Sequence, residues 1–102
     1  MNTLELFQWV VIEAAKYYDV RVSFIYEKDR MTEVVRARWL VMLTAYAHLD
    51  LNFNQIGRLL NRNHSTVLYG IERAKSLPEI VTATETVWTI VDAKKNQVIS
   101  QA

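Results

Sequence analysis

Residues 52–76 read NFNQIGRLLNRNHSTVLYGIERAKS and contain two short helical patterns separated by a polar break. Asn52 is a good N-cap residue and Gln55 follows at the capping-box position, so a first helix is predicted to begin here. A second helix is predicted to begin at position 63 or 64 and to end near position 76. Two short helices joined by a tight turn, with polar residues exposed on the second, are typical of a helix-turn-helix.

The second helix of this pair has two contrasting faces when it is projected at about 100° per residue. The face expected to meet the core carries Val67, Gly70, Ile71 and Ala74. The opposite face carries hydroxyl groups, a phenol, an acid and an arginine, from Ser65, Thr66, Tyr69, Glu72, Arg73 and Ser76. Such groups can reach base edges and phosphates in a major groove, and unpaired N–H groups at the helix start favour a phosphate. The alternative is that the polar residues at the helix start serve only as caps.

The rest of the chain is also predicted to be helical, which gives an all-α fold: a small bundle of about five to six helices containing the helix-turn-helix. A first helix is predicted over about residues 3–16, a central one over 33–49 and a last one over 78–96. The central helix is expected to be surrounded by other helices, because its apolar stripe of Val35, Trp39, Met42, Tyr46 and Leu49 is widened by Leu40, Leu43 and Ala47. Residues 20–26 are ambiguous, because their alternation is strand-like whereas Ser23 could cap a short helix. At 102 residues the chain has room for one core, so residues 1–102 are expected to form a single domain.

The composition excludes several classes of protein. Hydrophobic residues make up 51% of the chain, which is enough for folding and unlike a disordered chain. The absence of cysteine excludes disulfides, thiolate zinc sites and a cysteine nucleophile. Neither a signal peptide nor a run of roughly 18 apolar residues is present. We therefore expect a cytoplasmic protein that does not contact the membrane.

No catalytic centre, metal site or cofactor is expected. His48 and His64 lie 16 residues apart and have no metal-binding partners at i+3 or i+4. No nucleophile is paired with a matching base. Since Gly57 and Gly70 are the only glycines, a G-x-x-x-x-G-K-[ST] phosphate loop cannot be present.

Arginines gather around the motif, although the net charge is only +1. Between Arg58 and Lys75 the basic residues face a single acid, Glu72. A second basic cluster lies upstream and contains Arg30, Arg36 and Arg38. These clusters suit the phosphates of DNA, and the alternative is a solvated charged surface.

Residues 56–57, Ile-Gly, followed by residues 62–68, RNHSTVL, resemble the signature of the C-terminal DNA-binding domain of the bacterial replication initiator DnaA. That signature reads roughly I-G, a few residues, then R-D-H-[ST]-T-V-L. Upstream, Tyr17-Tyr18, Arg30 and the VRAR at 35–38 are similar to the family's preceding helix and basic loop. The resemblance covers about residues 10–76. It implies a helical bundle related to that of the Trp repressor.

The resemblance also implies double-stranded DNA as the partner and gives individual residues roles. Asn63, His64 and Ser65 fall where the family reads bases in the major groove. Arg30 falls where the family inserts an arginine into the adjacent minor groove. Further candidates come from the start of the first motif helix, from the outward face of the second and from the basic clusters. The full set of candidate DNA-binding residues is Arg30, Arg36, Arg38, Phe53, Asn54, Arg62, Asn63, His64, Ser65, Thr66, Tyr69 and Arg73.

The chain departs from the family signature in three ways. Asn63 replaces an acidic residue; Asp accepts a hydrogen bond, as from cytosine N4, whereas Asn also donates and often reads adenine. Leu60-Asn61 replaces an aromatic-Gly-Gly stretch, so the turn is one residue shorter. The ATPase module is missing from this sequence, which fits either a detached domain or a stand-alone protein.

The leading prediction is sequence-specific binding of double-stranded DNA, in the initiation or control of replication or in transcriptional regulation. The alternative is a helical protein that binds a partner or oligomerises without touching DNA. Its support is the last helix, where a wide apolar stripe is formed by Ile80, Thr84, Val87 and Val91 and widened by Val81 and Trp88. Such a stripe could bind a second copy or another protein, or simply cover the end of the bundle.

Overall fold

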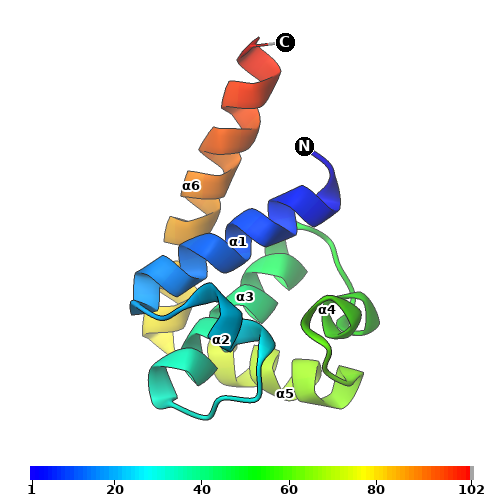
Figure 1. The fold of residues 1–102 in the computed structure, drawn as a ribbon, viewed down its shortest axis with the longest axis vertical. Helices are drawn as coiled ribbons and strands as arrows, with labels where there is room; N and C mark the ends of the chain where they lie inside the picture. Colours follow the sequence, from blue (N-terminus) through cyan, green and yellow to red (C-terminus); the bar gives the residue numbers. More distant parts are fainter. Residues whose placement is uncertain (102) are drawn as a thin grey trace.

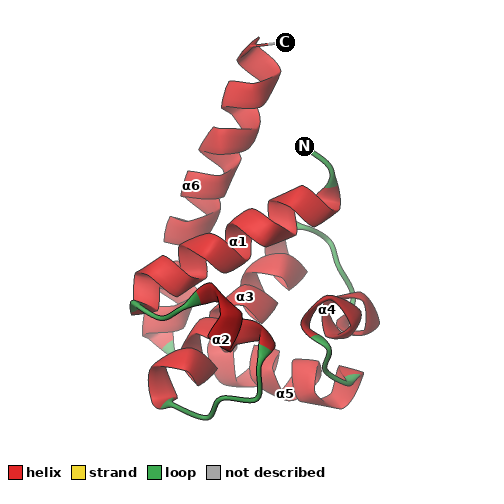
Figure 2. Ribbon diagram, viewed as in Figure 1, coloured by secondary structure: helices red, strands yellow, loops and turns green. Residues whose placement is uncertain are grey.

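Helices and short connections make up the whole of the described chain (Figures 1 and 2). The computed structural model describes the backbone of residues 1–101 and the side chains of residues 1–97. Over this span there are six helices: α1 (Thr3–Tyr18), α2 (Val22–Tyr26), α3 (Thr32–His48), α4 (Phe53–Leu60), α5 (His64–Lys75) and α6 (Pro78–Gln101). The predicted all-α fold of five to six helices is confirmed. None of the helices in this part of the chain has the length and apolar character needed to cross a bilayer.

α3 is the central helix, and α1, α5 and α6 pack around it (Figure 1). All residues from Leu40 to Ala45 are buried, which is more than one full helical turn. Even the polar member of this run is satisfied, because the Thr44 hydroxyl donates to the carbonyl oxygen of Leu40 at 2.8 Å. The prediction that other helices surround the central one is therefore confirmed.

The segment that was ambiguous in sequence folds as the short helix α2. Ile25 is fully buried in the core, while Val22 and Tyr26 on the same helix stay more than one third exposed. Arg21, not Ser23, is the N-cap residue, and its side chain makes no capping hydrogen bond. Burial of a single side chain, together with contacts to the carbonyl end described below, is what holds this helix in place.

Both glycines lie where a helix comes unusually close to another part of the chain. A Cβ atom on Gly57 would overlap the backbone carbonyl oxygen of Arg62, in the turn that follows α4. A Cβ atom on Gly70 would overlap the Met42 sulfur and lie 2.9 Å from Cδ1 of Trp39, on α3. The first glycine lets the turn fold back on α4, and the second lets α5 pack closely on α3.

α6 lies against α1 and α3 and then extends beyond them (Figure 1). Its predicted stripe is confirmed, since Ile80, Thr84, Val87 and Val91 are all buried. The helix continues to Gln101, beyond the predicted end at 96, because neither glycine nor proline interrupts it after Pro78.

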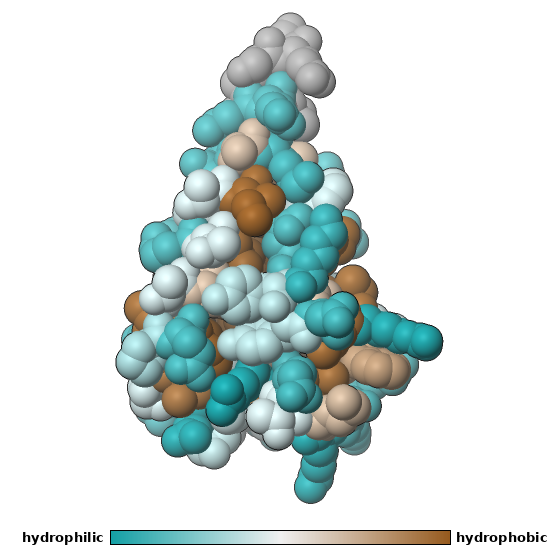
Figure 3. Space-filling view, turned by 90° about the vertical axis from the view of Figure 1, so that its left-hand side faces the viewer, coloured by the Kyte–Doolittle hydropathy of each residue, from teal (hydrophilic) through white to brown (hydrophobic). Residues whose placement is uncertain are grey.

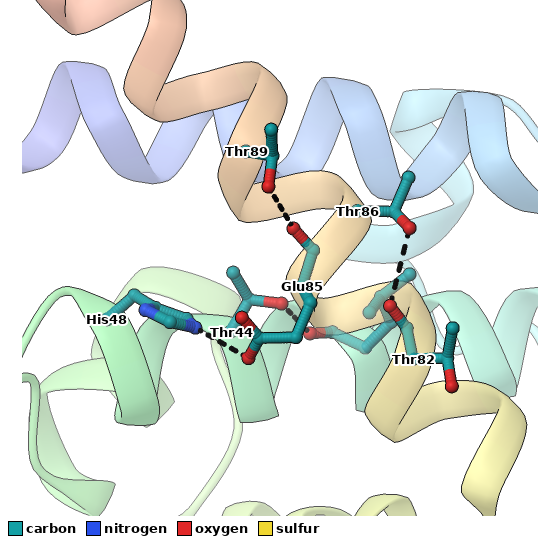
Figure 4. A network of polar contacts seen from close by, with 7 residues as sticks. Thr44, His48, Thr82, Glu85, Thr86 and Thr89 are labelled. Atoms are coloured by element: carbon teal, nitrogen blue, oxygen red, sulfur yellow. Dashed lines mark hydrogen bonds and ion pairs between the residues drawn. The ribbon is translucent and has the colours of Figure 1, made fainter.

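A polar contact joins the side of α6 to the end of α3 (Figure 4). His48 Nε2 lies 3.3 Å from Glu85 Oε1. The His48 ring also stacks on Trp88, with ring centroids 5.0 Å apart and planes 8° apart. Trp88, which widened the apolar stripe in the sequence, is therefore partly buried and packs against the core.

Candidate nucleic-acid interface

Hydrogen bonds define both the start of α4 and the short turn between α4 and α5. Asn52 Oδ1 accepts from the Gln55 N–H and Gln55 Oε1 accepts from the Asn52 N–H, both at 2.9 Å, which is the predicted capping box. Asn61 ends α4 in the left-handed region with φ 55°, a conformation that asparagine tolerates well. The Arg62 N–H then donates to the carbonyl oxygen of Gly57 at 2.8 Å. The two helices of the motif are thus held in one defined arrangement.

The start of α5 presents four exposed polar side chains in a row, Asn63, His64, Ser65 and Thr66. Asn63 is the N-cap, and its Oδ1 accepts from the Thr66 N–H at 2.9 Å. Capping occupies this oxygen, while the side-chain NH2 of Asn63 is the donor that remains for an outside acceptor. Capping and contact with DNA are therefore compatible at this residue.

The two faces of α5 are arranged as its sequence predicts. Val67, Gly70, Ile71 and Ala74 are buried, whereas the six polar residues of the opposite face are all exposed. On the exposed face the Tyr69 ring meets Trp39 edge-on, with centroids 6.3 Å apart. Arg73 lies over the same Trp39 ring at 5.5 Å. These contacts hold a phenol and a guanidinium on the exposed face of α5, in its middle and last turn.

Three of the predicted arginines line one surface groove, which is formed by Arg30, Thr32, Val35, Arg36, Trp39, Arg73 and Leu77. The arginines come from the α2–α3 loop, α3 and α5. Arg36 also pairs with Glu79 at 3.3 Å. Because both side chains are about half exposed, this ion pair is weak, and Arg36 can leave it for another anion. Trp39 is partly buried against the core and also forms part of this groove.

A second hollow lies at the motif's turn and is lined by Asn54, Gly57, Arg58, Asn61, Arg62, Asn63 and His64. It brings Asn54 of α4 next to the residues that start α5. Arg58 is exposed beside them and was not among the predicted contact residues. Phe53 is partly buried, because its ring stacks on Tyr46 with centroids 5.3 Å apart, so its main contact is with α3.

Arg30 lines both the groove and a third hollow. The third hollow is lined by Lys28, Asp29, Arg30, Val35, Arg38, Arg62 and Thr66. The Arg30 side chain is exposed, and this hollow brings its loop next to Thr66 in the first turn of α5. The predicted minor-groove residue and the predicted base-reading residues therefore belong to one continuous surface.

Arg38 lies in the interior of the protein, which corrects the prediction that it contacts DNA. The residue is 8% exposed. Its guanidinium donates to the carbonyl oxygens of Ile25 at 2.9 Å, Phe24 at 3.0 Å, Glu27 at 2.7 Å and Asp29 at 3.3 Å. Burial lowers the pKa of Arg38 from its ordinary value, and the nearby charge of Arg62 lowers it further. Each of the three guanidinium nitrogens thus donates to the protein's own backbone.

Arg62 is also turned toward the protein, although it is less deeply buried. Its Nη1 donates to the carbonyl oxygen of Leu60 at 2.6 Å and to that of Tyr26 at 3.3 Å. Its Nη2 donates to the carbonyl oxygen of Glu27. Burial lowers the pKa of the Arg62 guanidinium from its ordinary value. The sequence carried no signal for this orientation, because the accepting loop is more than thirty residues away.

The described side chains form no cluster of three or more His, Cys, Asp or Glu that could bind a metal ion. The chemistry of this surface is thus that of hydroxyl, amide, imidazole and guanidinium groups on one side of the bundle. Groups of these types can form hydrogen bonds with phosphates and base edges.

Comparison with known proteins matches the same segment. The family model described as bacterial dnaA protein helix-turn-helix matches residues 10–74. The chromosomal replication initiator protein DnaA of Bacteroides fragilis is 33% identical over 72 residues, which cover 70% of this chain and 15% of that protein. The protein of the same name from Bacteroides thetaiotaomicron is 35% identical over 66 residues, covering 64% of this chain and 14% of that protein.

The match to these relatives is confined to a small part of their length. The protein named DnaA from Mycoplasma pneumoniae is 29% identical over 72 residues, 70% of this chain but 16% of that protein. The matched segment of this chain contains α2, α3, α4 and nearly all of α5, together with every predicted contact residue. This chain belongs to the bacterial DnaA helix-turn-helix family.

Proposed function

We propose that this protein binds double-stranded DNA with a sequence preference, through the α4–α5 helix-turn-helix. The observation that carries the proposal is the run of exposed polar side chains at positions 63–66, at the start of α5. An α-helix fits the major groove, and its first turn reaches the base edges when the helix enters end-on. Asn63, His64 and Ser65 are the proposed base-reading residues.

The surrounding residues have the chemistry of backbone contacts. Arg36 and Arg73 border the groove beside α5 and are proposed to bind phosphates, since arginine forms paired hydrogen bonds with phosphate oxygens. Thr66, Tyr69 and Asn54 add hydroxyl and amide groups on the same side. Arg30 is proposed to enter the adjacent minor groove, where narrow A·T-rich DNA attracts arginine. Arg38 is not part of this set, and Phe53 contributes mainly by packing α4 on α3.

The biological role proposed is the initiation of chromosome replication or its control. Support comes from the relatives, which are named chromosomal replication initiator proteins, and from the match to their helix-turn-helix. Transcriptional regulation, the other role predicted from sequence, has no specific observation in its favour. Either role would act on the chromosome, in agreement with the predicted cytoplasmic location.

Association through α6 is the alternative reading. Val81 and Ile90 are 44% and 40% exposed on this helix, whereas Trp88 is held against His48. On the face shown in Figure 3, hydrophobic residues form separate areas within a largely hydrophilic surface. A second copy or another protein bound at α6 remains a prediction, which the measurement of mass in solution described below decides.

The test of the proposed function is the salt dependence of binding to a labelled duplex, followed by fluorescence anisotropy. Each phosphate contact contributes about −0.9 to the slope of log K against log salt concentration. We expect a steep wild-type slope that becomes shallower by about 0.9 in Arg73→Ala. Lys94→Ala, which removes a cation lying over the Trp9 ring, is the matched control and should leave the slope unchanged. Absence of wild-type binding at low salt refutes the proposal.

A further inference from the structure

The short helix α2 ends in backbone carbonyl groups that two arginines satisfy. The last carbonyl groups of any α-helix lack partners within the helix and carry partial negative charge. Here the carbonyl oxygens of Phe24, Ile25, Tyr26 and Glu27 accept hydrogen bonds from guanidinium groups. A helix of five residues has little stability of its own, so these bonds hold the helix end and the loop that follows it.

The two arginines reach this helix end from different parts of the chain. Arg38 comes from α3, the element that the loop leads into. Arg62 comes from the turn between α4 and α5, and it shares the Glu27 carbonyl oxygen with Arg38. Arg62 is the connection between the α2–α3 loop and the helix-turn-helix.

Arg62 is anchored at both ends. Its backbone N–H bonds to Gly57, and its carbonyl oxygen lies against the same glycine, so the backbone follows the motif's turn closely. Its side chain is bound to the loop that carries Arg30. Residue 63, the first proposed base reader, follows directly in the chain. The placement of Arg30 relative to the start of α5 therefore depends on the Arg62 side chain.

We propose that Arg62 is a positioning residue which, together with Arg38, holds loop residues 27–31 against the α4–α5 turn and so sets where Arg30 meets DNA relative to the base-reading end of α5. This inference rests on the proposed function. It gives Arg62 a role other than the phosphate contact that the basic cluster predicts. It implies that the A·T-rich flank and the central bases must lie at a fixed distance from each other along the duplex.

The two roles of Arg62 are separated by the variant Arg62→Lys. Lysine keeps the positive charge but has a single ammonium group in place of the planar fork that reaches Leu60, Tyr26 and Glu27 together. A phosphate contact would largely survive this change, whereas the connection to the loop would not. Arg58→Lys is the matched control, because Arg58 is an exposed arginine lining the hollow at the same turn.

The first arm measures binding to two duplexes that share a central site and differ only in an A·T-rich or G·C-rich flank. Arg30→Ala should reduce the preference for the A·T-rich flank by about tenfold, the equivalent of one charge-assisted hydrogen bond. Arg62→Lys should reduce it by a similar factor, and the double variant should lose no more than either single variant. Arg58→Lys should keep the wild-type preference.

The second arm needs no DNA. Lys28 and Arg30 are trypsin sites within the loop, and Lys16 on α1 is a site outside it. Arg62→Lys should speed cleavage after Lys28 and Arg30 by about tenfold relative to cleavage after Lys16, because a loop with fewer hydrogen bonds opens more often. Arg58→Lys should leave this ratio at its wild-type value.

The inference is overturned if Arg62→Lys keeps both the flank preference and the protected loop. It is equally overturned if Arg62→Gln weakens all duplexes by one factor and Arg62→Lys restores them, since that is the behaviour of a phosphate contact. A wild-type protein that binds no duplex would defeat the proposed function itself. The two failures are distinguishable, because in the first the wild type binds and discriminates.

Discussion

Replacement of Gly57 by alanine is expected to destabilise the fold at the motif's turn. The added methyl group would overlap the carbonyl oxygen of Arg62, a backbone atom that cannot rotate away. The turn would have to move off α4, and the start of α5 would move with it. Gly70→Ala is the natural comparison, because Gly70 is also helical and buried, but its nearest neighbour is the sulfur of the Met42 side chain.

The expected magnitudes follow from opposing terms. Alanine in place of a helical glycine contributes about 1 kcal/mol of stability through propensity, and this gain is common to both sites. Overpacking costs about 1–3 kcal/mol, and a fixed backbone neighbour at position 57 favours the upper end. Gly57→Ala should therefore lower the free energy of unfolding by about 2 kcal/mol. Gly70→Ala should change it by less than about 1 kcal/mol, because its two close neighbours, the Met42 sulfur and Trp39 Cδ1, belong to side chains that can shift.

Urea denaturation followed by circular dichroism at 222 nm measures both variants against the wild type. The slope of the transition should stay constant, so that the shift in midpoint reports stability alone. The glycine-to-alanine change acts on the unfolded chain equally at both positions, which makes the difference between the variants a property of the folded state. A Gly57→Ala protein as stable as the wild type, or more stable than Gly70→Ala, would refute this account of the turn.

Two further predictions concern residues outside α5. Arg38→Met keeps the volume of the buried side chain but leaves several carbonyl groups of α2 without donors, so the free energy of unfolding should fall by about 3 kcal/mol. An unchanged urea midpoint would contradict the role of Arg38 as the donor to these carbonyl groups. Trp88→Gln should cost about 2 kcal/mol through the lost packing on His48, whereas Val81→Gln should be nearly neutral in stability. Sedimentation equilibrium of the wild type and Val81→Gln tests association. A wild-type oligomer that Val81→Gln dissociates would support a partner surface on α6. A monomer in both cases would exclude self-association there.

Much of the local structure could be predicted because its causes are local. The capping box at Asn52 and Gln55 and the cap at Asn63 depend on residues three positions apart, and both form as expected. The two faces of α5 follow from helical periodicity, because its buried residues recur every three or four positions with polar residues between them.

Periodicity failed where most positions are apolar. On α3 the predicted stripe included Val35, Trp39 and Tyr46, but Val35 and Trp39 are only partly buried and Tyr46 is 39% exposed. The deeply buried residues lie beside them, as Leu40 and Val41 show. When nearly every side of a helix is apolar, the pattern cannot say which side faces solvent, and the packing of α1, α5 and α6 decides it.

The arginines were the least predictable part of the site. In the sequence Arg30, Arg36 and Arg38 form one basic cluster. In the structure Arg30 is exposed, Arg36 pairs weakly at the surface, and Arg38 is buried among carbonyl groups. The fate of each side chain depends on acceptors elsewhere in the fold, and the carbonyl end of α2 could not be anticipated while α2 itself was ambiguous. The charge pattern indicated where arginines gather but not which of their side chains stay exposed.

The central claim is that the start of α5 reads bases, and a parallel selection of bound duplexes from a random pool tests it most directly. Asn63→Asp retains an oxygen to cap the Thr66 N–H but replaces the outward amide donor with an acceptor. With the wild type we predict one enriched motif, which in Asn63→Asp shifts at a single position, from adenine toward cytosine on the contacted strand. Ser65→Ala should lose preference at a neighbouring position. Identical motifs from all three proteins, or no enriched motif from the wild type, would contradict the claim.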